Sequence, residues 1–77
     1  MPGLHKRSLM IAGHRTSVAL EPEFWAALED AARADGTTLA LLIAAIDADR
    51  ATTAPDRLLA SACRVYALRR AGVTPPR

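Results

Sequence analysis

Polar and apolar positions alternate with a period of two over residues 14–20, directly after Gly13. Alternation of this kind, with β-branched residues among the apolar positions, predicts a β-strand with one buried face. The face expected to be buried comprises Thr16, Val18 and Leu20. The face expected to be exposed comprises Arg15, Ser17 and Ala19. The apolar residues 9–12 either extend this strand or form a separate short segment that breaks at Gly13.

Beyond the strand, apolar residues recur at helical spacing, which predicts helices rather than further strands. The first helix is expected over residues 22–34, since Gly36 can end it in a left-handed conformation. The second is expected over residues 38–50, behind an N-cap formed by Thr37 or Thr38.

A third helix is expected over residues 54–71, after a short linker. Thr53 and Asp56 have the spacing of a capping box at its start, and Gly72 can end it. The chain is thereby divided into a disordered arm over residues 1–5, one domain over residues 6–71 and a tail over residues 72–77.

The predicted strand has no partner, because no other segment of the chain is a convincing second strand. A lone strand would leave backbone donors and acceptors unpaired along both edges. Pairing with the same strand of a second copy across a two-fold axis removes this problem. We therefore expect a mainly α-helical fold with one β-strand, in which an intertwined dimer forms an antiparallel two-stranded ribbon. The dimer core is expected to comprise Thr16, Val18, Leu20, Phe24, Trp25, Leu28, Leu39, Leu42, Ile43 and Ile46.

A chain of 77 residues builds a modest core and usually needs a staple or a partner. Its single cysteine, Cys63, cannot form an internal disulfide and is expected to be a small buried hydrophobic residue. His5 and His14 stand apart, so no metal site and no cofactor are expected. No nucleophile, base and orienting group occur together, so we do not expect an enzyme.

Charge is distributed unevenly, although the formal net charge is only +2. Residues 1–20 carry three basic residues and no acid, residues 21–49 seven acids and one arginine, and residues 50–77 six arginines and one aspartate. The basic N-terminal segment favours an anionic partner, with Lys6 and Arg7 expected to neutralise phosphates. The apolar runs are too short for a membrane span or a signal peptide, so we expect a cytoplasmic protein without a membrane partner.

Several runs of residues resemble one family of DNA-binding proteins. The run Arg15–Phe24, a short helix, Gly36-Thr37-Thr38 and a second amphipathic helix resemble the ribbon-helix-helix regulators. A short bacterial subfamily of ribbon-helix-helix domain proteins is similar in the runs Lys6-Arg7-Ser8, Ile11–Ser17 and Leu20–Trp25. The resemblance covers about residues 6–70, with the third helix as an addition to the simplest form of the fold.

This resemblance implies roles for two parts of the chain. The outward side chains of the ribbon, Arg15, Ser17 and Ala19, would contact base edges in the DNA major groove. The backbone amides at Thr37 and Thr38 would hold a phosphate. Ala19 departs from many relatives, which carry a long polar or basic residue at this position, and its methyl group can contact only thymine.

We therefore predict a homodimeric DNA-binding transcriptional regulator of bacterial type. Its partners would be double-stranded DNA and a second copy of the chain. The alternative is a dimerisation or protein-interaction module, including an antitoxin-like one, with a protein partner and weak or no specific DNA binding. Ala19 and the acidic helices favour this alternative, as would an Arg15 side chain that pairs with Glu21 or Glu23.

Overall fold

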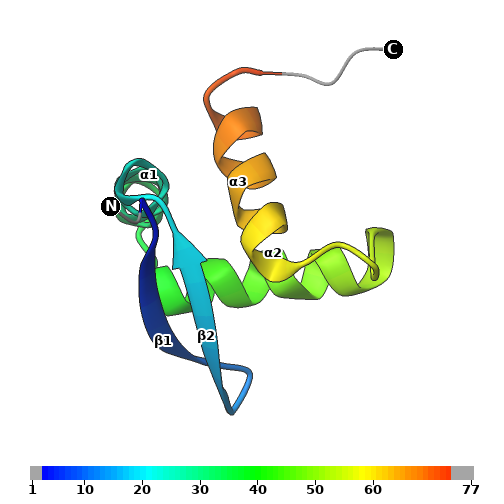
Figure 1. The fold of residues 1–77 in the computed structure, drawn as a ribbon. Coiled ribbons are helices and arrows are strands. Elements are labelled where there is room, and N and C mark those ends of the chain that lie inside the picture. Colours follow the sequence, from blue (N-terminus) through cyan, green and yellow to red (C-terminus); the bar gives the residue numbers. More distant parts are fainter. Residues whose placement is uncertain (1–2, 74–77) are drawn as a thin grey trace.

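The structure, a computed structural model, describes residues 3–73 of the chain. A two-stranded antiparallel hairpin is followed by three helices (Figure 1). The elements are β1 (His5–Ile11), β2 (His14–Leu20), α1 (Pro22–Ala34), α2 (Leu39–Thr53) and α3 (Leu59–Arg70).

The expectation of a single strand was wrong, because β2 pairs with β1 of the same chain. The register runs from His5 opposite Leu20 to Ile11 opposite His14. β1 also alternates, but its first two inward positions hold polar residues, the exposed His5 and the half-buried Arg7. The sequence of β1 therefore shows no alternation of polar and apolar residues before residue 8. His5, the last residue of the predicted disordered arm, lies in β1, and the first two residues of that arm lie outside the described part of the chain.

Ala12 and Gly13 form the turn between β1, which ends at Ile11, and β2, which begins at His14. The two turn residues, Ala12 and Gly13, both have positive φ, at 51° and 83°. A two-residue loop with positive φ at both positions is the type I′ turn, whose twist matches that of the flanking strands. Of the two interpretations of residues 9–12, the structure has the separate segment rather than an extension of the strand over residues 14–20. Residues 9–11 are the end of β1, and Ala12 lies in the turn.

The inner face of the hairpin packs on all three helices, with α2 against β1 and with α1 and α3 against β2. In the view of Figure 1, α3 rises steeply from α2 and the hairpin turn extends beyond the helices. The core comprises Ile11, Val18, Leu20, Trp25, Leu28, Ala31, Ala32, Leu42, Ile43, Ile46, Ala62 and Cys63. No helix within residues 3–73 is long and apolar enough to cross a lipid bilayer.

Most side chains of the expected dimer core are thus buried inside one chain. Those that are buried are Val18, Leu20, Trp25, Leu28, Leu42, Ile43 and Ile46, and those that are half-buried are Thr16, Phe24 and Leu39. α3 closes this core, because Ala62 and Cys63 pack into it. The third helix is therefore part of the fold rather than an appendage.

The helix bounds agree with expectation for α1 and differ for the other two. α2 continues to Thr53, and α3 begins only at Leu59 rather than at residue 54. The expected capping box does not form, because the Thr53 hydroxyl donates to the carbonyl of Asp49 at 2.9 Å. Thr53 is thus the last residue of α2 and not the cap of α3.

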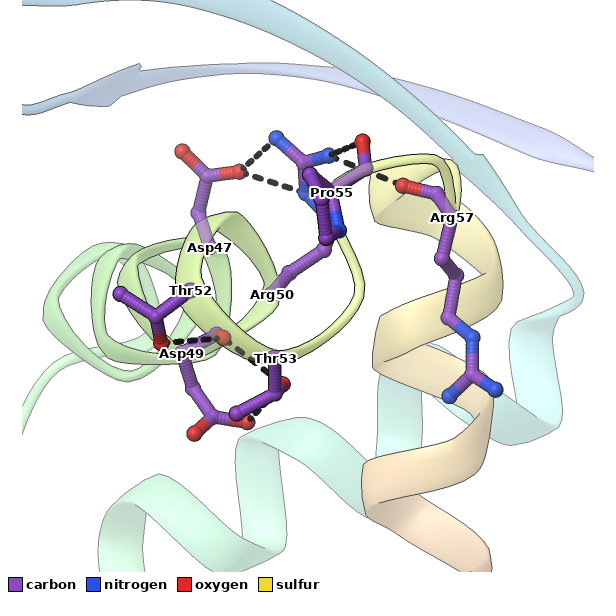
Figure 2. Close-up of polar contacts among 7 residues, drawn as sticks. All are labelled: Asp47, Asp49, Arg50, Thr52, Thr53, Pro55 and Arg57. Atoms are coloured by element: carbon purple, nitrogen blue, oxygen red, sulfur yellow. Dashed lines mark hydrogen bonds and ion pairs between the residues drawn. The ribbon is translucent and has the colours of Figure 1, made fainter.

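A single arginine organises the loop between α2 and α3. The guanidinium of Arg50 binds the Asp47 carboxylate at 2.8 and 3.0 Å and donates to the carbonyls of Pro55 and Arg57 at 3.3 and 2.9 Å (Figure 2). Arg50 therefore links the last turns of α2 to a loop that has no regular structure of its own. The side chain of Arg57 extends away from this cluster.

Candidate nucleic-acid interface

The outer face of the hairpin is built from both strands. Cross-strand pairing places Lys6 opposite Ala19, Ser8 opposite Ser17 and Met10 opposite Arg15. Ala19 is half-buried and the other five residues are exposed. The side chains predicted to read bases, Arg15, Ser17 and Ala19, therefore share one face with three residues that the sequence analysis did not place there. Those additional residues are Lys6, Ser8 and Met10.

This face carries two positive charges and no acid. Lys6 and Arg15 form no ion pair with a carboxylate of residues 3–73. Arg15 instead donates to the Ser8 hydroxyl across the strands, with an Nη1–Oγ distance of 3.4 Å. Glu21, with which Arg15 could have paired, is bound by Arg64 of α3 instead, at an Nε–Oε1 distance of 3.0 Å. A backbone hydrogen bond, together with Arg64, lowers the pKa of Glu21.

Arg7 lies on the opposite face of β1 from Lys6. Its guanidinium pairs with Glu29 of α1 at 2.8 Å and lies 4.6 Å from the ring centroid of Trp25. The indole of Trp25 in turn donates to the carbonyl of His5 at 2.8 Å. Arg7 thus holds β1 against α1, which the prediction of Arg7 as a phosphate contact did not anticipate.

The start of α2 offers backbone amides at a helix N-terminus. Thr38 is the N-cap, and its hydroxyl accepts from the amide of Leu41 at 3.1 Å. The amide of Thr37 already donates to the carbonyl of Ala32 at 2.9 Å. The first intrahelical bond runs from the Leu42 amide to the Thr38 carbonyl. Before it, the amides of Thr38, Leu39 and Ala40 have no partner among the described residues, so these are the donors that a phosphate could use.

The uneven charge along the chain is largely paired internally. α3 meets the acidic middle segment through Arg64 with Glu21 and through Arg70 with Asp35 at 2.8 Å. The hydrogen bond from Arg70 lowers the pKa of Asp35. Two arginines of the basic C-terminal segment, Arg64 and Arg70, therefore dock α3 on acidic residues of the same chain.

A second surface feature lies between α2 and α3. It is a groove of about 550 Å³ whose lining includes Leu42, Ile46 and Tyr66. Arg57 and Arg69 also line it, and neither forms an ion pair with a carboxylate of the described residues. The groove therefore combines an apolar wall with these two arginines, with Arg50, which pairs with Asp47, and with one acid, Asp49.

Residues 4–71 match the family model of the ribbon-helix-helix domain. The match covers nearly the whole chain, so the chain belongs to the ribbon-helix-helix family, as the sequence resemblance predicted. A search of curated proteins and a search of solved structures each find no match to the chain.

Proposed function

We propose that the chain is a transcriptional regulator that inserts its β-ribbon into the major groove of double-stranded DNA. One observation carries this proposal: the ribbon's outer face presents Lys6 and Arg15 without a neutralising carboxylate. A two-stranded ribbon has dimensions that the major groove admits. Proteins of this family typically bind DNA and associate with themselves, which supports a homodimer on DNA. The location that goes with this proposal is the bacterial cytoplasm.

Each position of the interface has a proposed role. Arg15 donates to guanine O6 and N7, Ser17 bonds a base edge, and Ala19 offers a methyl group to thymine. Lys6 neutralises a phosphate, and the backbone amides that follow Thr38 bind another at the start of α2. Arg7 is left out of this set because Glu29 and the ring of Trp25 already engage its guanidinium.

The proposal is tested by titrating a fluorescent duplex with the protein at several salt concentrations. We expect log affinity to fall linearly with log salt, because bound phosphates release counterions. Arg15→Ala should weaken binding by about 1–3 kcal/mol. Arg33→Ala is the matched control, since Arg33 is an exposed arginine on α1 that pairs only with Asp30. Binding that is absent in low salt, or equal for both variants, contradicts the proposal.

The second candidate is a protein-interaction module, and the groove between α2 and α3 favours it. Its lining residues on α3, Ala62, Val65, Tyr66 and Arg69, recur at the spacing of one helix face. An apolar groove of this kind suits a docked amphipathic helix. The cations Arg57 and Arg69 would select a helix that carries carboxylates beside its apolar stripe.

A designed acidic amphipathic peptide is the probe for this second function. If the groove docks such a helix, the peptide binds the wild type more tightly than a variant with Arg57→Glu and Arg69→Glu. A lysine-bearing version of the same peptide then shows the reverse preference. Equal binding of both peptides to both proteins removes this candidate.

A further inference from the structure

We infer that β1 supplies half of the base-reading face, and that Met10 recognises the methyl group of a thymine next to the guanine bound by Arg15. This inference rests on the proposed DNA-binding function. It adds a specificity-determining residue from a strand whose presence in the ribbon only the pairing register reveals.

Met10 is an exposed residue on the outer face of β1. Its relative exposure is 54%, whereas Ile11 beside it is buried and Leu9 packs against the core. The outward position on β1 leaves Met10 without a place in the core cluster. Because Met10 is not part of the core cluster, its side chain is available to contact a molecule that meets the outer face of the ribbon.

The register places Met10 directly opposite Arg15. Side chains directly opposite each other on an antiparallel pair have Cβ atoms about 5 Å apart. Successive base pairs along B-DNA are separated by about 3.4 Å. Two side chains at that separation therefore reach the same base pair or adjacent ones when the ribbon lies in the major groove.

The chemistry of the two side chains then predicts what they select. Arginine fits guanine O6 and N7, whereas the thymine C5-methyl is the apolar group that the major groove displays. A flexible thioether can adapt to that methyl group. Ser8 is a positioning residue in this arrangement, because its hydroxyl accepts from Arg15 at 3.4 Å and holds the guanidinium on the outer face. The preferred site therefore contains a guanine with a thymine within one base-pair step.

The test first selects bound duplexes from a random library with the wild-type protein. In the selected duplex, the thymine next to the conserved guanine is then replaced by deoxyuridine, which lacks only the C5-methyl group. We expect wild-type affinity to fall about fourfold, the effect of one buried methyl group. Met10→Ala should bind the two duplexes equally, whereas Met10→Leu should retain a preference for thymine.

Two controls separate this inference from the proposed function. Deoxyuridine placed outside the selected site should leave affinity unchanged, and Met10→Ala should keep the wild-type melting temperature and salt slope, because Met10 is exposed and uncharged. If deoxyuridine weakens binding equally in the wild type and in Met10→Ala, or in neither, the role of Met10 is overturned while DNA binding through Arg15 stands. If the wild type shows no salt-dependent binding, the proposed function itself fails.

Discussion

At the scale of single residues, the hairpin turn contains a mismatch between residue type and backbone conformation. Ala12 has a φ of 51°, in the left-handed region that disfavours residues with a Cβ other than asparagine and aspartate. Type I′ turns prefer Asn-Gly, and this chain has Ala-Gly. The turn is therefore a place where stability can be raised without touching the core.

Ala12→Asn is expected to stabilise the fold by about 0.5–1 kcal/mol, measured by urea denaturation. The matched change at the next position, Gly13→Ala, should destabilise it by about 1 kcal/mol, since Gly13 has a φ of 83°. A stabilising Gly13→Ala would show that the two-residue turn is assigned incorrectly.

Cys63 gives a second prediction at the residue scale. Burial raises the pKa of its thiol to about 11, from an ordinary value of 9.0, and the nearby Asp47 carboxylate adds to the shift. The folded state therefore holds the thiol proton more tightly than the unfolded state does. The contribution to stability is complete below pH 9 and is lost as the pH rises through 11.

Two measurements check this behaviour of Cys63. The folded protein should react with iodoacetamide at pH 8 much more slowly than the urea-unfolded chain, because the thiolate is the nucleophile. The decline of unfolding free energy between pH 9 and pH 11 should be shallower in Cys63→Ala than in the wild type. Equal reaction rates in folded and unfolded protein would contradict the burial of Cys63.

At the scale of elements, the loop between α2 and α3 depends on one side chain. Arg50→Ala removes the bonds to Asp47, Pro55 and Arg57, so we expect a loss of about 1–2 kcal/mol in unfolding free energy. Amide hydrogen exchange should accelerate over residues 54–58. Arg33→Ala, whose pair with Asp30 is 74% exposed at both partners, should change stability by less than about 0.5 kcal/mol. Similar losses in the two variants would remove the special role of Arg50.

The elements also show what the sequence can and cannot predict. α1 was bounded correctly because Pro22 and Gly36 are specific helix signals at its two ends. β1 was missed because Arg7 occupies an inward position, and only its contacts with Glu29 and Trp25 explain how an arginine can lie there.

Some residues of the candidate site could likewise be predicted from the sequence, and others could not. The outward face of β2 follows from alternation alone, so Arg15 and Ser17 could be predicted as exposed ribbon residues. Ser8 and Met10 join that face through the strand register, which is a long-range property that no local pattern contains. The start of α3 was misplaced for a related reason: the spacing of Thr53 and Asp56 suits a cap, but Arg50 binds the loop beyond it.

At the scale of the whole molecule, the expected reason for dimerisation was an unpaired strand, and that reason does not hold. β2 finds its partner in β1, and α3 covers the core of the same chain with Ala62 and Cys63. The proposed homodimer would therefore assemble from chains that are already folded. Its formation would serve DNA binding, in which two copies can occupy two half-sites, rather than folding.

Whether each chain folds on its own can be measured by unfolding the protein at different concentrations without DNA. If each chain folds on its own core, the midpoint of urea unfolding should stay constant over a hundredfold range of protein concentration. If two chains share one core, mass action adds about 2.7 kcal/mol to the apparent stability over the same range. A midpoint that rises with concentration would therefore show that folded chains associate without DNA, as both the intertwined dimer and a dimer of separately folded chains require.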